Sequence, residues 1–156
     1  MAEKNNNYIL IGMPGSGKST IGVLLAKALG YDFVDTDLVI QQKGGNDGFK
    51  QLEEDVNASI DVNKSVIAPG GSAVYSDKAM RHFKEIGTII YLKLDYQTVK
   101  RRLGNLKARG VVLEKGQTLR DLYNERIPYY EKYADITVKL DKLSIGNSLE
   151  KVLENL

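Results

Sequence analysis

The 156-residue chain contains 42% hydrophobic and 27% charged residues, a composition typical of a globular domain and not of a disordered chain. Its formal net charge of +2 supplies no strong field that would favour nucleic acid or an acidic membrane. The absence of cysteine excludes disulfides, thiolate metal sites and a cysteine nucleophile. No apolar run approaches the ~20 residues that span a bilayer, and the start MAEKNNN lacks the apolar stretch of a signal peptide. We therefore expect a cytoplasmic monomer whose partner is a small molecule, with no membrane or nucleic-acid partner.

Short apolar, β-branched runs alternate with segments of helical period along the chain. Strands are predicted at residues 8–11, 31–35, 65–68, 88–94 and 135–140. Helices are predicted at 18–29, with Gly30 as the C-cap, and at 77–86, 95–106, 118–133 and 147–155. This alternation is typical of parallel β-α-β units, and the continuously apolar strands fit burial on both faces. The sequence predicts one α/β domain over residues 1–156, with helices on both sides of a parallel sheet.

Two segments interrupt the alternation. Residues 41–49 (QQKGGNDGF) are rich in glycine and polar residues, which predicts a loop. Residues 106–117 (LKARGVVLEKGQ) lie between two predicted helices and carry Arg109 and two glycines. Loops of this kind at the ligand edge of an α/β sheet often act as lids.

The segment GMPGSGKS, residues 12–19, matches the phosphate-binding pattern G-x-x-x-x-G-K-[ST] and lies between a predicted strand and a predicted helix. Glycines let successive backbone N–H groups converge on phosphate oxygens, and the helix start adds the positive end of its dipole. Lys18 can reach the β- and γ-phosphates, and the Ser19 hydroxyl can complete a Mg²⁺ shell. The alternative is a glycine-rich turn with a chance lysine, which the strand-loop-helix context disfavours. The predicted ATP-binding residues of this segment are Met13, Pro14, Gly15, Ser16, Gly17, Lys18, Ser19 and Thr20.

Asp35 and Asp37 follow the second predicted strand. Their spacing of two places both carboxylates on one side of an extended chain. One can hold Mg²⁺ through water, and the other can orient an acceptor hydroxyl or accept its proton. A solvated turn that caps the following helix is an equally consistent interpretation of Asp-Thr-Asp.

The chain resembles the shikimate kinases, which are small enzymes of the nucleoside-monophosphate-kinase-like group. The resemblance rests on LIGMPGSGKSTIG (10–22), FVDTD (33–37), GGS (70–72), Arg109 and ERIPYYEKYADITV (125–138), which occur in the family's order. It covers nearly the whole chain, and the Asp-x-Asp pair together with R-x-P-x-Y-E-x-x-A-D is its most specific part. It implies a three-layer P-loop fold with five parallel strands in the order 2-3-1-4-5, an acceptor-binding segment at about 37–60 and a lid at about 105–117.

The resemblance also implies individual roles. Asp35 corresponds to the family's residue near Mg²⁺, together with Ser19. Asp37 corresponds to the residue that binds the acceptor hydroxyl and can act as a base. The backbone of Gly70 and Gly71 is expected to touch the acceptor. The remaining implied roles belong to three arginines: Arg126 pairs with the acceptor carboxylate, Arg109 closes on the phosphates, and Arg102 lies beside the adenine. Because Arg101 and Arg102 are adjacent on a predicted helix, we expect only one of them to face a nucleotide.

Three positions depart from the family pattern. Ser72 stands where a third consecutive glycine is usual, and Gly110 stands in place of the proline that follows the lid arginine. Lys50, in FKQLE, occupies the place of a second carboxylate-binding arginine. Lysine keeps the charge but lacks the planar fork that grips a carboxylate through two bonds. The segment between Asp37 and Lys50 is also shorter than in the family.

The sequence therefore predicts an ATP- and Mg²⁺-dependent kinase with Lys18, Asp37 and Arg109 as catalytic residues, acting on a small carboxylate-bearing metabolite, with shikimate as the leading acceptor. Lys50 and Ser72 leave open a kinase for another hydroxy acid or amino acid, such as homoserine or threonine. A regulatory domain that binds ATP without transferring phosphate is the third hypothesis. Three neighbouring tyrosines of the C-terminal motif, Tyr129, Tyr130 and Tyr133, are interpreted as packing residues with one edge in contact with water.

Overall fold

The computed structural model describes residues 6–36, 49–103, 115–140 and 143–156 and, within these, all side chains except those of residues 49–52. Five parallel strands form one sheet in the order β2-β3-β1-β4-β5, which confirms the expected order. The strands are β1 (Asn7–Ile11), β2 (Asp32–Asp35), β3 (Ser65–Ala68), β4 (Gly87–Lys93) and β5 (Ile136–Lys139).

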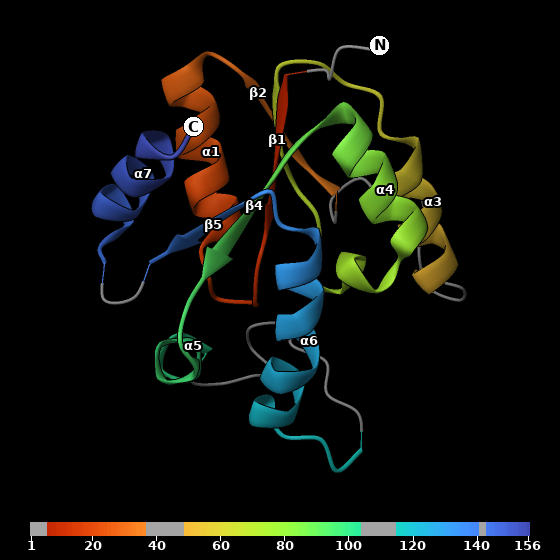
Figure 1. Ribbon diagram of the computed structural model, residues 1–156, viewed down its shortest axis with the longest axis vertical. Coiled ribbons are helices and arrows are strands. Elements are labelled where there is room, and N and C mark those ends of the chain that lie inside the picture. Colours follow the sequence, from red (N-terminus) through yellow and green to blue (C-terminus); the bar gives the residue numbers. More distant parts are fainter. Residues whose placement is uncertain (1–5, 37–48, 104–114, 141–142) are drawn as a thin grey trace.

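Helices cover both faces of the sheet. The described helices are α1 (Lys18–Leu29), α3 (Phe49–Ser59), the 3-10 turn η1 (Gly71–Tyr75), α4 (Asp77–Ile86), α5 (Tyr96–Leu103), α6 (Leu119–Tyr133) and α7 (Ile145–Glu154). Figure 1 shows α1 and α7 on one side of the sheet and α3 and α4 on the other, so the three-layer prediction is confirmed. The sequence did not predict α3 or η1. Most of the two predicted loops, 41–49 and 106–117, lies outside the described residues.

Local sequence signals account for the helix ends. Gly30 ends α1 in the left-handed conformation (φ 70°) and donates its N–H to the carbonyls of Ala26 and Lys27, as a C-cap glycine should. A capping box of Thr118 and Asp121 begins α6 by satisfying two backbone N–H groups reciprocally. The predicted C-cap of α1 is therefore confirmed.

The core lies on both faces of the central strands, where Ile9, Leu10, Ile89 and Ile90 are completely buried. One polar side chain at the amino end of β1 fixes the register. Asn7 donates its amide to the carbonyls of Val62 and Ile86 at 2.9 and 3.0 Å and accepts from the N–H of Ser65 at 2.9 Å. This buried amide satisfies backbone groups just before β3, at the start of β3 and at the end of α4. It therefore specifies the register of β1 against β3 and β4.

Helix α1 packs unusually close to the edge strand β2. A methyl group at Gly22 would stand 2.5 Å from Cε1 of the Phe33 ring and 3.4 Å from Cδ1 of Leu10. Only glycine permits this approach without displacement of the ring.

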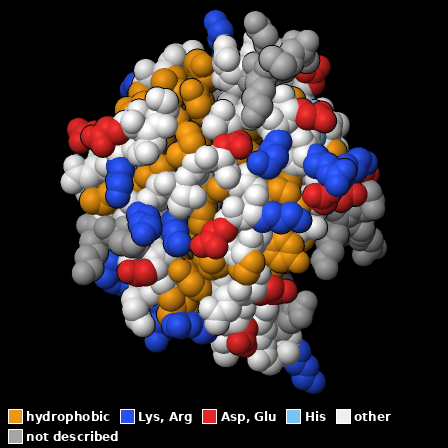
Figure 2. Space-filling view, viewed as in Figure 1, with side chains coloured by type: hydrophobic (Ala, Val, Ile, Leu, Met, Phe, Trp, Pro, Cys, Tyr) orange, Lys and Arg blue, Asp and Glu red, His pale blue; other side chains and the backbone are white. Residues whose placement is uncertain are grey.

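The parallel strands bring their carboxyl ends to one edge of the sheet, toward the lower part of Figure 1, where α5 and the start of α6 lie. The segments that follow β1, β2, β3 and β4 therefore meet there, and ligands of open α/β sheets bind at this edge. Among the described residues, no helix has both the length and the apolar character needed to cross a membrane. Over the described part of the face in Figure 2, acidic and basic side chains are interspersed.

Candidate active site

The loop after β1 is curled by three glycines with positive φ, namely Gly12 (155°), Gly15 (81°) and Gly17 (89°). Side chains at these positions would be strained and also obstructed. A Cβ atom at Gly12 would lie 2.8 Å from the carbonyl oxygen of Leu92, and one at Gly15 would lie 3.2 Å from the side chain of Leu103. The loop is therefore held against the end of β4 and against α5 in a shape that L-residues rarely adopt.

The start of α1 presents backbone donors and a cation to this loop. Gly17 caps the helix in the left-handed conformation, and as a glycine it offers no side chain to accept a hydrogen bond from the first turn. The N–H groups of that turn are consequently suited to an anion. The ammonium group of Lys18 donates to the carbonyls of Gly12 and Met13 at 2.7 and 3.1 Å, so it lies against the curled loop. The buried hydroxyl of Ser16 has no hydrogen-bond partner among the described residues, which marks a further polar group in this cradle.

Asp35 ends β2, two strands away from the loop. It pairs with Ala68 of β3, and β3 in turn pairs with β1. With strands about 4.8 Å apart, Asp35 stands roughly 10 Å across the sheet from β1. That separation leaves room for a phosphate group and a hydrated cation between the acid and the loop. Asp37 lies outside the described residues.

A second cluster lies where η1 meets α6. Arg126 of α6 is only 9% exposed, and its Nη1 atom stands 2.5 Å from the position that a Cβ at Gly71 would occupy. Its Nε donates to the hydroxyl of Tyr75 at 3.4 Å, and the hydroxyl of the fully buried Tyr130 donates to the carbonyl of Gly71 at 3.3 Å. Among the described residues, no carboxylate forms an ion pair with Arg126.

The electrostatic environment keeps this cluster protonated at neutral pH. Burial disfavours the charged guanidinium, but its interactions with Tyr130 and Tyr75 outweigh burial and place the pKa of Arg126 above its ordinary value. Burial is also the main cause that raises the pKa of Tyr130 to about 12, against the opposing influence of Arg126. A positive guanidinium beside two neutral phenols is suited to bind an anionic group.

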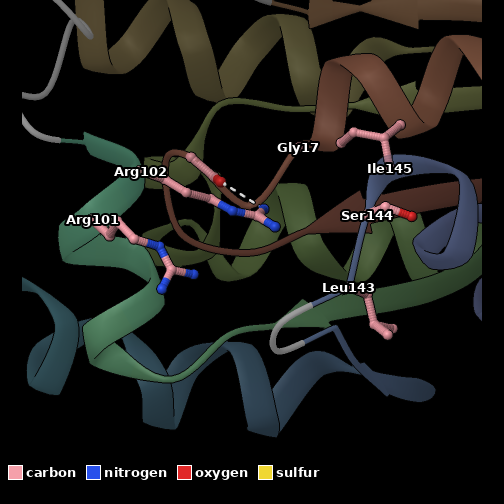
Figure 3. A pocket seen from close by; sticks show the side chains of 7 residues that line it. Gly17, Arg101, Arg102, Leu143, Ser144 and Ile145 are labelled. Carbon is pink, nitrogen blue, oxygen red and sulfur yellow. Dashed lines mark hydrogen bonds between the residues drawn. The ribbon is translucent and has the colours of Figure 1, made fainter.

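An open cavity of about 570 Å³ adjoins the phosphate loop, within the size range of ligand sites. Figure 3 shows α5 on one side of it and the chain that enters α7 on the other. Arg102 donates from Nη1 to the carbonyl of Gly15 at 3.2 Å, which joins α5 to the loop. The cavity is lined by Gly15, Gly17, Arg101, Arg102, Leu143, Ser144 and Ile145. Both arginines line it, and the expectation that only one of them faces a nucleotide stays a prediction.

The structure thus gathers most of the predicted residues at one edge of the sheet. Residues 12–20 form the curled loop and the first turn of α1, and Arg102 contacts that loop. Gly70 and Gly71 follow β3, where Gly71 meets Arg126. The side chains of Asp37, Lys50 and Arg109 lie outside the described part of the chain.

Sequence reasoning missed two groups of residues. Leu143, Ser144 and Ile145 line the cavity because β5 is two strands from β1 in the sheet, and no local pattern marks them. Tyr75 and Tyr130 contact the arginine cluster. Tyr130 is interpreted from the sequence as a packing residue with one edge in contact with water; its complete burial confirms the packing and contradicts the contact with water, because its hydroxyl donates to the carbonyl of Gly71 instead.

A parallel sheet of this order with a glycine-rich loop after its central strand defines a P-loop nucleotide-binding protein. The shikimate kinase family model matches residues 14–156, and the chain belongs to this family, which confirms the resemblance. It is accordingly an ATP-dependent kinase.

Two relatives and one solved structure illustrate the match. A shikimate kinase from Histophilus somni (strain 2336) is 35% identical over 100% of this chain and 99% of that protein. One from Chlorobium chlorochromatii (strain CaD3) is 34% identical over 97% of this chain and 91% of that protein. The structure of shikimate kinase from Acinetobacter baumannii in complex with shikimate is similar with a TM-score of 0.84 and 28% identity, covering 97% of this chain and 93% of the other.

Proposed function

We propose that this chain transfers the γ-phosphoryl group of ATP to a hydroxyl group of shikimate, giving shikimate 3-phosphate. The observation that carries the acceptor assignment is the environment of Arg126. This guanidinium is 9% exposed, lies against Gly71 and has no carboxylate partner among the described residues. Because a buried charge without an opposite charge is costly, a carboxylate of the ligand is the expected partner. The similarity to a shikimate kinase in complex with shikimate supports the same acceptor.

The nucleotide half of the proposal uses the curled loop and the cavity beside it. The N–H groups at the start of α1 and the ammonium group of Lys18 would receive the β- and γ-phosphates. The cavity would hold the nucleoside, with Arg102 on one wall and Ile145 on the other. An apolar wall opposite a cationic one suits a purine, which offers a flat face and polar edges.

The donor atoms present fit a magnesium ion. Mg²⁺ prefers oxygen ligands, keeps several waters and takes only one or two protein ligands in phosphate sites. Ser19 in the first turn of α1 and Asp35 at the end of β2 offer such oxygens at the same edge of the sheet. The described residues contain no cluster of three His, Cys, Asp or Glu, and a site shared with phosphates and water needs none. When bound, the metal would neutralise phosphate charge.

The acceptor half is proposed to use residues at about 37–60 together with Gly70, Gly71 and Arg126. Lys50 would add a second positive charge for the carboxylate. Asp37 would orient the acceptor hydroxyl and accept its proton as the hydroxyl oxygen bonds to the γ-phosphorus. The bond from that phosphorus to ADP breaks in the same displacement, and Lys18 with the lid residue Arg109 would neutralise charge on the transferring group.

A kinase for another hydroxy acid remains the second candidate, because Ser72 places a side chain in the glycine turn and Lys50 replaces an arginine. A coupled ADP-release assay with shikimate, homoserine and threonine tests both candidates, and calorimetry measures ATP binding independently. We expect turnover with shikimate at micromolar to millimolar KM. Turnover with homoserine or threonine alone would contradict the acceptor assignment. ATP binding without transfer to any acceptor would contradict the kinase proposal.

A further inference from the structure

Tyr75, the last residue of η1, makes two different contacts with the Arg126 guanidinium. Its hydroxyl accepts a hydrogen bond from Nε at 3.4 Å, and its ring lies with the centroid 5.6 Å from Cζ. The first contact fixes one edge of the guanidinium, and the second lies within the range of a cation–π interaction. Tyr75 belongs to none of the motifs that identify the family.

Tyr75 is itself held in place by α6. Its ring packs edge-on against Tyr129, with centroids 5.1 Å apart and planes at 71°. Burial is the main cause that raises the pKa of Tyr75; a hydrogen bond with Arg126 lowers it, and one with Glu125 raises it. Glu125 in turn accepts a hydrogen bond from Gln117 at 3.1 Å. The raised pKa keeps the Tyr75 hydroxyl protonated at neutral pH while its oxygen accepts from Arg126.

We propose that Tyr75 is a positioning residue that sets the orientation of Arg126 toward the acceptor carboxylate. The inference rests on the proposed function of Arg126. A guanidinium grips a carboxylate through two parallel N–H bonds only when its plane is correctly oriented. Tyr75 engages Nε, and Gly71 lies against Nη1, so the plane is fixed from two sides. Tyr75 thereby tunes selectivity for carboxylate-bearing acceptors without touching the reacting atoms.

Because the contact acts on acceptor binding, its loss should change one kinetic constant selectively. Tyr75→Phe removes the hydroxyl and keeps the ring, whereas Tyr75→Leu removes both contacts. We expect the KM for shikimate to rise about 5- to 10-fold in the first variant and further in the second. The kcat and the KM for ATP should stay within about 2-fold of wild type, because the phosphate loop is untouched. Tyr129→Phe is the matched control, because among the described contacts Tyr129 forms neither a hydrogen bond nor a cation–π contact with Arg126 and the variant keeps the ring that packs on Tyr75; all three constants should be unchanged.

Two further measurements separate this inference from the proposed function. The ratio of kcat/KM for shikimate to that for its neutral methyl ester should fall in Tyr75→Phe, since discrimination depends on the oriented guanidinium. In an Arg126→Lys background, Tyr75→Phe should have no further effect, because the planar fork is already gone. A Tyr75→Phe enzyme with wild-type shikimate KM, while Arg126→Lys raises that KM, would overturn the inference alone. An Arg126→Ala enzyme with wild-type shikimate KM would overturn the inference and the carboxylate role of Arg126 together.

Discussion

The hydroxyl of Ser72 donates a 2.7 Å hydrogen bond to the carboxylate of Glu53. Ser72 belongs to η1, and Glu53 is a largely buried residue of α3 with 7% exposure. The contact ties α3 to the turn after β3, at the position where the family pattern has a third glycine. The residue that departs from that pattern therefore has a definite structural partner.

Ser72→Ala should destabilise the protein, because it removes a hydrogen bond to a mostly buried carboxylate. We expect a loss of about 1 to 2 kcal/mol in the free energy of unfolding, measured by urea denaturation. Ser59→Ala is the control: its hydroxyl donates to the carbonyl of Val56 in the same helix, and its loss should cost less than about 0.5 kcal/mol. Equal stability of the two variants would show that the Ser72 contact contributes nothing.

Gly71→Ala should weaken acceptor binding with little effect on stability. The new methyl group would stand 2.5 Å from Nη1 of Arg126, the far end of a side chain that can move aside. We expect the KM for shikimate to rise about 10-fold or more, while the thermal midpoint changes by only a few degrees. Gly146→Ala is the matched control, since among the described residues no atom beyond its chain neighbours and its own helix backbone lies within 4 Å of the added Cβ. An unchanged shikimate KM in Gly71→Ala would show that Arg126 does not bind the acceptor.

Arg102→Ala should raise the KM for ATP about 5- to 20-fold with a smaller change in kcat. The variant loses the hydrogen bond to Gly15 and one cationic wall of the cavity. Arg101→Ala makes a close comparison, because Arg101 lines the same cavity but forms no hydrogen bond with the loop among the described residues. Steady-state kinetics at saturating shikimate give both constants. A larger effect from Arg101→Ala would reverse the two assignments.

Arg109→Ala should lower kcat by about 10³-fold and leave ATP binding nearly unchanged. An arginine that neutralises charge on the transferring phosphoryl group acts in the transition state far more than in the ground state. Single-turnover rates and calorimetric ATP affinities measure the two effects separately. The exposed Lys115 supplies the control Lys115→Ala, which should retain both. Parallel losses of rate and affinity would contradict the lid role.

Stability should decline as pH rises from about 10 to 12. The pKa of Tyr130 and that of Tyr133 are both raised to about 12, in each case chiefly by burial, with the hydrogen bond to Asp77 adding for Tyr133. Tyrosines of the unfolded chain lose their protons near pH 10, whereas these two keep theirs in the folded state until about pH 12. Their contribution to the free energy of unfolding is therefore fully present below pH 10 and is lost as the pH rises toward 12. The Tyr130 hydroxyl accounts for roughly 2 to 3 kcal/mol of this loss, and the Tyr133 hydroxyl for less, because solvent screens its interaction with the half-exposed Asp77.

Urea titrations at pH 9, 10, 11 and 12 test this dependence directly. Tyr130→Phe and Tyr133→Phe should each flatten the alkaline decline, whereas Tyr129→Phe should not. If the free energy of unfolding of Tyr130→Phe and of Tyr133→Phe declined with pH as much as that of wild type, other groups would cause the decline.

The phosphate loop and the strands could be predicted because their signals are local. The glycine spacing at 12–17 is typical of a phosphate-binding loop, and continuous apolar runs indicate the buried strands. Helix α3 could not be predicted, because its buried face includes the polar residues Glu53 and Asn57 beside Val56. A face of that composition produces little apolar periodicity.

The cavity and the arginine cluster depend on tertiary order, which local patterns do not encode. Ile145 reaches the phosphate loop only because β5 stands beside β4, and the sheet order came from family resemblance. Tyr75 approaches Arg126 from 51 positions earlier in the chain, through the packing of η1 on α6. A lone tyrosine after a glycine turn carries no signal of that contact.

The missing side chain at Gly22 has a geometric consequence for the reaction. It lets the helix that carries Lys18 settle onto Phe33, two residues before Asp35 on the same strand. With the roles proposed for Lys18 and Asp35, the glycine at position 22 thereby helps to set the distance between the phosphate loop and the acid that ends β2. To enlarge that distance for a bulkier alcohol, Gly22 would be the first position to substitute, with the phosphate loop at residues 12–19 left unchanged.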